Sequence, residues 1–360
     1  MLEVKKTTRW ALAAMLAAAT ITGVSTTATA KEQINVGACV SWPGYSFFEI
    51  VRQQNLAPDY DIDISIFEDP LGGHAALATG QLDVYLCTGD YTPVAAARGL
   101  DVTNVAVQNL VYGVDKVVIG PGLEPEDLRG QRIAAPQAYI GQLVMGLWLD
   151  SVGISPDEVT WVNLNADEAV GPTMSGDLGA AYMYEPWVNQ VVDNLDGARI
   201  IADTSAPELM ETGIFMDVMY MNTNFIAEHR EAAIDMLKAR FEATAYWNEH
   251  TEEVNQAFAD YLQWSKADIE SIMGTNGKYL EGGLYMLDFN EVARICGVMD
   301  GAPPFGIENG AMESIVELTN EWWIKLDLMD EMLADPSDAF DCSLVADLAA
   351  QGYRQDFSAR

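Results

Sequence analysis

The sequence predicts an α/β protein of two lobes, each a mixed sheet flanked by helices, joined by a two-strand hinge. From residue 33 onward, short apolar runs alternate with amphipathic stretches, which is typical of strands connected by crossover helices. One strand-and-loop motif occurs once in each half of the chain. The chain has 360 residues, a length that suits two domains with sizeable cores.

The first thirty residues have the pattern of a secretory signal peptide. Basic residues at positions 5, 6 and 9 precede a short apolar segment at 11–24, and Ala28-Thr29-Ala30 supplies small residues for cleavage after Ala30. The apolar segment is shorter than the roughly 20 residues that span a bilayer. We therefore expect residues 1–30 to be removed and the mature protein to be periplasmic.

Strands and helices alternate in two series. In the first series, the expected strands are 33–40, 60–67 and 82–89, and the expected helices are 45–54, 72–79 and 92–99. In the second, the strands are 131–136, 159–164, 178–184 and 198–203, and the helices are 139–151, 166–174 and 185–194. The remainder is expected to be helical, at 223–247, 251–261, 266–273 and 311–332.

A repeated motif and two extended segments indicate how the lobes are joined. Residues 79–95 (TGQLDVYLCTGDYTPVA) align loosely with 175–191 (SGDLGAAYMYEPWVNQV), each with a turn, a strand and a loop that carries an acid, an aromatic and a proline. Extended segments at 105–119 and 213–221 are expected to cross between the lobes, which permits closure. The predicted lobes are therefore residues 31–112 with 218–360, and residues 113–217.

The charge of the chain is strongly negative. It is −35 overall, and removal of residues 1–30 leaves 16 basic and 53 acidic residues, a net charge of −37. Nucleic acid and anionic lipid surfaces repel a chain of this sign, so neither is an expected partner. The acidic surface is consistent with a salty external medium, and a monomer is expected.

Four cysteines allow three disulfide pairings, and their spacing in the sequence does not determine which one forms. We expect one bridge, between Cys296 and Cys342 in the helical C-terminal region. Cys39 and Cys87 lie at the ends of predicted core strands, where free buried thiols are common.

Two segments carry a resemblance to a known family. PEDLRGQRIAAPQAY at 125–139 and VGISPDEVTWVNLNADEAVGPTMSGDLGAAYMYEPW at 152–187 resemble the ABC-importer periplasmic solute-binding proteins for sulfonates, taurine, nitrate and thiamine precursors. The resemblance covers about residues 34–221. It implies a type II periplasmic-binding-protein fold, a ligand in the interlobe cleft, and delivery to an ABC permease in the inner membrane. Gly179 departs from the family, in which many members carry Asp at this position.

Ligands of open parallel sheets lie beyond the carboxyl ends of the strands, which singles out six loops. These are residues 41–45, 68–74, 88–91, 137–142, 165–168 and 184–187, and none contains Lys or Arg. Aromatic rings attract cations and a carboxylate fixes an amine, so the loops indicate a nitrogen-containing solute such as an amine, a betaine or taurine. The predicted ligand-binding residues are Trp42, Tyr45, Asp90, Tyr91, Tyr139, Glu185 and Trp187.

Structural roles compete with these assignments. Trp187 is equally suited to the core, Glu185 to capping the helix that follows it, and Asp90 to bonding its own backbone. An anion also remains open, because helix N-termini at Gly72-Gly73 and Gly141-Gln142 could hold one through backbone N–H groups.

The sequence contains no motif for catalysis. It lacks a nucleophile elbow, a phosphate loop and a dinucleotide fingerprint, so neither an enzyme nor a cofactor is expected. The three histidines are far apart, which argues against a metal site, and His74 in a Gly-rich loop is the only one near the predicted cleft. A ligand sensor that serves a membrane receptor and, with less support, an enzyme like thiamine-pyrimidine synthase are the alternatives.

Overall fold

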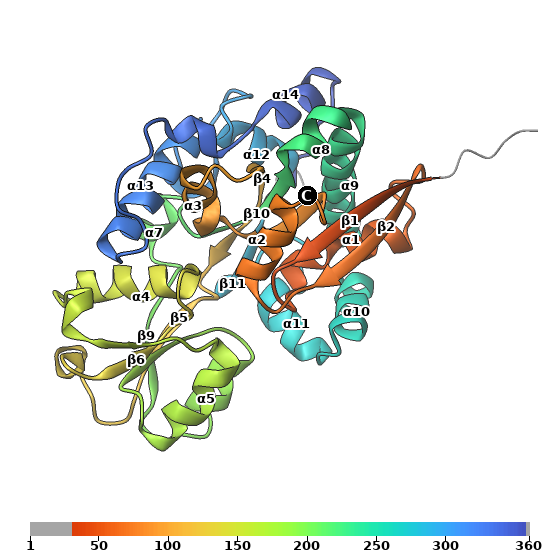
Figure 1. The fold of residues 1–360 in the computed structure, drawn as a ribbon. Coiled ribbons are helices and arrows are strands. Elements are labelled where there is room, and N and C mark those ends of the chain that lie inside the picture. Colours follow the sequence, from red (N-terminus) through yellow and green to blue (C-terminus); the bar gives the residue numbers. More distant parts are fainter. Residues whose placement is uncertain (1–30, 358–360) are drawn as a thin grey trace, which may run out of the picture. The chain divides into compact units, whose positions relative to one another are not determined.

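Two mixed β-sheets organise residues 31–357, which the computed structural model describes. Residues 32–357 belong to a single compact unit (Figure 1). The predicted signal peptide at residues 1–30 lies outside the described residues.

The first sheet has six strands in the order β11-β4-β10-β3-β1-β2. Its strands are β1 (Glu32–Ala38), β2 (Tyr60–Ile66), β3 (Val84–Thr88), β4 (Val102–Tyr112), β10 (Met216–Asn222) and β11 (Gly283–Met286). β1 pairs in parallel with β2 and β3, whereas β10 is antiparallel to β3 and β4. β3 is buried along its whole length and β1 is buried from Val36 to Ala38, as expected for strands covered on both faces.

The second sheet has five strands in the order β7-β6-β8-β5-β9. Its strands are β5 (Lys116–Ile119), β6 (Arg132–Ala134), β7 (Thr160–Val162), β8 (Ala180–Met183) and β9 (Arg199–Asp203). β3 and β8, the strands of the repeated sequence motif, hold the same place in their sheets. Each lies between a parallel neighbour, β1 or β6, and an antiparallel one, β10 or β5.

Helices connect the strands and pack on the sheets (Figure 1). They are α1 (Phe47–Gln53), α2 (Pro70–Ala78), α3 (Thr92–Ala97), α4 (Ile140–Ser151), α5 (Ala166–Ser175), α6 (Trp187–Val192), α7 (Pro207–Met210), α8 (Thr223–Glu228), α9 (Arg230–Glu249), α10 (Thr251–Leu262), α11 (Lys266–Met273), α12 (Phe289–Ile295), α13 (Met312–Lys325) and α14 (Ser343–Ala350). Strand β11 and helices α7, α12 and α14 were not predicted. The helix expected at 223–247 is broken at His229, where the backbone leaves helical geometry and the ring lies 2.6 Å from Glu32 on β1.

The chain passes between the sheets twice. The first passage, at residues 113–115, joins β4 to β5, and the second, at 204–215, joins β9 to β10. The two passages are hydrogen-bonded to each other, because Gly113 N–H donates to Thr204 Oγ1 (3.1 Å) and Thr204 N–H to the Asp115 carbonyl (3.1 Å). The second passage comes earlier than predicted, since all of β10 pairs within the six-stranded sheet. The predicted lobe boundaries remain a prediction.

All four cysteines of the described residues form disulfides, Cys39 with Cys87 and Cys296 with Cys342. The Cys296–Cys342 bridge agrees with the prediction, whereas the prediction of free thiols at Cys39 and Cys87 was wrong. β1 and β3 are neighbours, so the cysteines at their ends lie with Cα atoms 5.3 Å apart. Sequence spacing could not show this, because the pairing of β1 with β3 is a long-range contact.

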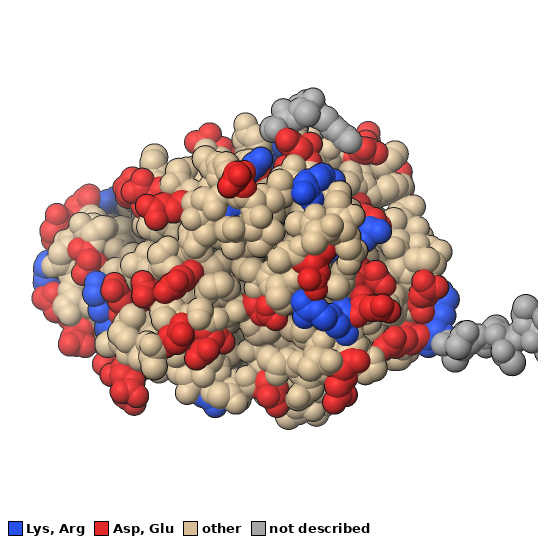
Figure 2. All heavy atoms as spheres, turned by 90° about the horizontal axis from the view of Figure 1, so that it is seen from above, with Lys and Arg blue, Asp and Glu red and all other residues tan. Residues whose placement is uncertain are grey.

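The surface carries many more acidic than basic side chains, spread over the face shown in Figure 2. Within residues 31–357, no helix has the length and apolar character needed to span a membrane.

Candidate functional site

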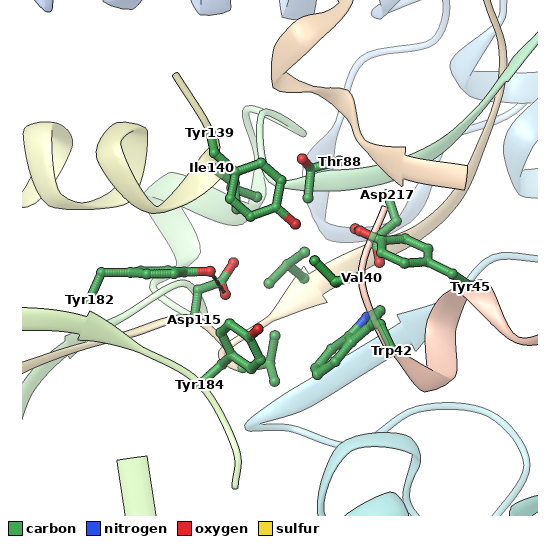
Figure 3. Close-up of a pocket in the computed structure, with 12 residues that line it drawn as sticks. Val40, Trp42, Tyr45, Thr88, Asp115, Tyr139, Ile140, Tyr182, Tyr184 and Asp217 are labelled. Carbon is green, nitrogen blue, oxygen red and sulfur yellow. Dashed lines mark hydrogen bonds between the residues drawn. The ribbon is translucent and has the colours of Figure 1, made fainter. Parts of the chain in front are cut away.

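A small cavity lies where the carboxyl end of β3 in one sheet and that of β8 in the other meet the first passage of the chain. It is lined by Val40, Trp42, Tyr45, Thr88, Val111, Val114, Asp115, Tyr139, Ile140, Tyr182, Tyr184 and Asp217 (Figure 3). The cavity has a volume of about 310 Å³, including its opening.

Aromatic rings from both sheets form the walls. The Trp42 ring follows β1 and meets the Tyr184 ring, which follows β8, edge-on at 5.4 Å between centroids. Tyr184 lies 6.0 Å from the Tyr182 ring, and the Trp264 ring meets the Trp42 ring edge-on at 6.4 Å between centroids. π-faces of this kind attract cations and bury alkyl groups.

Asp217 projects from β10 into the cavity. Tyr45 O–H donates to its Oδ1 at 2.7 Å, and Oδ2 has no hydrogen-bond partner among the described residues although the side chain is 1% exposed. Burial raises the pKa of Asp217 to about 6, against the opposing effect of donors, Tyr45 first, and of the Arg240 charge. Arg240 does not line the cavity, and its guanidinium lies over the Phe47 ring at 3.9 Å.

Asp115 stands on the other side of the cavity, in the first passage (Figure 3). Its Oδ1 accepts a hydrogen bond from Tyr182 O–H at 2.6 Å. Burial is the main cause that raises its pKa to about 7, and the negative charge of Asp217 adds to the rise. Tyr45, in the turn that follows β1, and Tyr182, in β8, thus orient one carboxyl group each.

A third buried acid, Asp90, lies close to this pair but does not line the cavity. Its backbone carbonyl accepts a hydrogen bond from the Trp323 indole at 2.6 Å, and its Oδ1 has no partner among the described residues. Burial raises its pKa to about 7, and the charge of Asp217 contributes to the rise.

Glu185, a predicted ligand-binding residue, forms a buried ion pair instead. Lys116 Nζ lies 2.9 Å from Glu185 Oε1 and also donates to the Val114 carbonyl at 3.2 Å. Neither Glu185 nor Lys116 lines the cavity. The Glu185 side chain makes no capping hydrogen bond to α6. The neighbouring Tyr184 lines the cavity, and the assignment of Glu185 to ligand binding stays a prediction.

The structure brings three of the predicted residues together and separates others. Trp42, Tyr45 and Tyr139 line the cavity, and Trp187 lines a second hollow that shares Tyr139 and Tyr184 with it.

Tyr91 stacks on His74, with ring centroids 3.9 Å apart, away from the cavity. His74 lies in α2, within the helix expected at 72–79; it is 1% exposed, and desolvation lowers its pKa to about 3. The described residues contain no group of three or more His, Cys, Asp or Glu side chains that could hold a metal ion.

The glycines considered for anion binding serve packing. A Cβ at Gly141 would lie 2.5 Å from the Tyr182 ring, and one at Gly73 would clash with Tyr85. These glycines therefore let tyrosine rings lie against α4 and α2.

Sequence reasoning missed Asp115 and Asp217, and Tyr182 as a wall residue. Both acids lie in segments that were assigned to the hinge, LVYGVDKVV and GIFMDVMYM. A lone carboxyl inside an otherwise apolar extended segment was the available signal, since such a group is buried only at a cost.

Comparison with known proteins agrees with this architecture. The NMT1-like family model matches residues 124–262. A protein of Brucella abortus (strain 2308), named as a binding protein, is 24% identical over 251 residues, which is 69% of this chain and 76% of that protein. The taurine-binding periplasmic protein of Escherichia coli (strain K12) is 25% identical over 172 residues, 47% of this chain and 52% of that protein.

Among solved structures, the alkanesulfonate-binding protein of Xanthomonas axonopodis pv. citri bound to MOPS superposes with a TM-score of 0.64. It is 16% identical, and the match covers 86% of this chain and 99% of that one. The predicted resemblance and the predicted periplasmic-binding-protein fold are confirmed. The named relatives are binding proteins and not enzymes, in agreement with the sequence prediction.

Proposed function

From the resemblance of this chain to periplasmic solute-binding proteins, we propose that it is the extracytoplasmic solute-binding protein of an ABC importer. It captures a small nitrogen-containing organic solute between its two lobes and delivers it to a permease in the inner membrane. The observation that carries the proposal is the cavity, which combines aromatic rings from both sides with two oriented carboxyl groups, Asp217 of β10 and Asp115 of the first passage.

Two further observations support a periplasmic location. The first thirty residues have the pattern of a signal peptide. The described part of the chain holds two disulfides, which persist in oxidising compartments.

The mechanism is a shift between open and closed forms. Residues 113–115 and 204–215 connect the sheets, and they bear one of the cavity acids, Asp115. A solute that contacts Asp115 on one side and Asp217 on the other stabilises the closed form over the open form. The permease then recognises the closed form.

Ligand should raise the melting temperature and reduce the radius of gyration. Binding to the folded state alone adds roughly 2.7 kcal/mol of stability at a ligand concentration 100 times Kd. Thermal unfolding and small-angle scattering should be measured with amines, betaines, taurine, sulfonates and pyrimidines. If no compound in this panel shifts either quantity, the solute-binding proposal is wrong.

Trp42→Ala should weaken ligand binding about tenfold or more while the protein stays folded, because it removes a ring from the wall. Trp42→Phe keeps a ring and should retain most of the affinity. Titration calorimetry gives the affinities, and circular dichroism reports the fold. Collapse of the alanine variant would instead assign Trp42 to the core.

A further inference from the structure

We propose that the solute is a compact alkylammonium ion that has N–H bonds and no acidic group, held between Asp115 and Asp217. This inference rests on the proposed function and selects among the amine, betaine and taurine classes.

The unpartnered oxygen requires a donor. Asp217 Oδ2 is buried and accepts no hydrogen bond within the described residues, although Tyr45 occupies Oδ1 of the same carboxylate. Polar hydrogens of Trp42 and Asn109 help to lower the pKa of Asp217, but neither residue makes a hydrogen bond to Oδ2. Leaving a charged acceptor unpaired is costly, so an N–H group of the solute is the partner that the geometry lacks.

The buried charges around the cavity have an excess of acids. Four carboxyl groups are buried there, and two bases face them. The acids are Asp90, Asp115, Glu185 and Asp217, and the bases are Lys116 and Arg240. Lys116 forms its ion pair with Glu185, and although its charge also acts on Asp115, Asp115 makes no ion pair of its own among the described residues. A cationic solute supplies the missing positive charge without protonation of the carboxyl groups.

The walls offer little to an anionic group. None of the residues that line the cavity is Lys, Arg or His. The hydroxyl hydrogens of Tyr45 and Tyr182 are already donated to Asp217 and Asp115. A sulfonate or carboxylate in the cavity would therefore meet two carboxyl groups, with only neutral donors on Trp42, Thr88, Tyr139 and Tyr184 to hold it, which disfavours taurine and betaine.

The aromatic rings of the cavity suit the alkyl part of the solute, and the carboxylate oxygens distinguish ammonium ions with N–H bonds from those without. Trp42, Tyr139 and Tyr184 present aromatic surface that buries methylene groups. A quaternary ammonium could use these rings, but it has no N–H and would leave Asp217 Oδ2 unpaired. The site should therefore prefer a primary ammonium to a tetramethylated one.

The test uses two-carbon amines and sulfonates, with two quaternary ammonium compounds for comparison, and calorimetry on the mature protein at pH 8. Ethylamine and ethanolamine should bind at least tenfold more tightly than taurine, ethanesulfonate, glycine betaine and tetramethylammonium. Tighter binding of taurine or ethanesulfonate than of the amines overturns the inference and leaves the solute-binding proposal intact. Tighter binding of tetramethylammonium or betaine overturns it as well. Absence of binding by every compound contradicts both.

Carboxyl variants locate the site. Asp217→Asn and Asp115→Asn should each weaken ethylamine binding at least tenfold. Asp63→Asn, which changes an exposed acid on β2, should leave it unchanged. Equal affinities for all three variants would overturn the placement of the ammonium between Asp115 and Asp217.

Discussion

Replacement of Asp115 by asparagine is expected to weaken alkylammonium binding by about 30- to 1000-fold and to stabilise the ligand-free protein at pH 8. Loss of one member of a desolvated, hydrogen-bonded charge pair costs about 2–4 kcal/mol of binding free energy. Asparagine keeps the shape of the side chain and an oxygen for the Tyr182 hydroxyl, so the cavity wall is retained.

The stabilisation follows from burial. Above pH 7, the folded protein holds Asp115 ionised in a site that raises its pKa to about 7, whereas the unfolded chain solvates it. Removal of that charge should raise the free energy of unfolding by roughly 1–3 kcal/mol, measured by urea denaturation. Loss of stability together with unchanged affinity would show that Asp115 is a structural residue and not a ligand contact.

Asp217→Asn provides a matched comparison. It should weaken binding to a similar degree, but it should stabilise the protein less. The reason is Arg240, a fully buried guanidinium whose pKa is raised by the charge of Asp217 while desolvation lowers it to about 9. Without Asp217, this cation loses an opposite charge, which offsets the gain from the removed carboxylate.

The strands of both sheets were predictable because their apolar runs are short and bounded by polar turns. The repeat of residues 79–95 at 175–191 predicted that both halves share a unit, and β3 and β8 hold equivalent places. β11 was missed because four residues of mixed character, GLYM, carry too little pattern.

The site was predictable only where loops follow parallel strands. Trp42, Tyr45 and Tyr139 were found in this way, whereas Asp115 and Asp217 lie in extended segments. Asp115 and Asp217 line one cavity only because of long-range strand pairing, in which β10 lies between β3 and β4. The ion pair of Glu185 with Lys116 depends likewise on the pairing of β8 with β5.

Similarity to relatives indicates the fold of this chain and not the side chains that line its cavity. The alkanesulfonate-binding protein of Xanthomonas axonopodis shares this fold at 16% identity, which fixes the positions of sheets and loops and not the side chains. The ligand specificity of this chain therefore has to be explained by its own carboxyl groups and rings.

Ligand-free stability and ligand affinity are expected to change with pH in opposite directions. The pKa values of Asp90 and Asp115 are about 7 and that of Asp217 about 6, all raised by burial above their unfolded value near 3.9. Between about pH 4 and 7 the folded state thus binds protons that the unfolded state has lost. The contribution of these groups to stability is present below pH 4 and is lost as the pH rises to 7. Glu291, whose pKa burial also raises to about 7, adds to this loss.

Binding of an alkylammonium ion requires ionised carboxylates, so it releases protons below pH 7. The amine itself stays charged from pH 5 to 8, since its pKa is near that of lysine, about 10.4. Affinity should therefore rise with pH by up to about tenfold per unit for each proton released, and it should level off above about pH 8. Calorimetry at pH 5, 6, 7 and 8 measures this slope, and thermal unfolding gives the opposite slope of the ligand-free protein. In the double variant Asp115→Asn/Asp217→Asn the affinity slope should flatten, whereas the contribution of Glu291 to stability should persist. Affinity that grows toward acid pH would instead identify an anionic solute, because protonated carboxyl groups repel anions less.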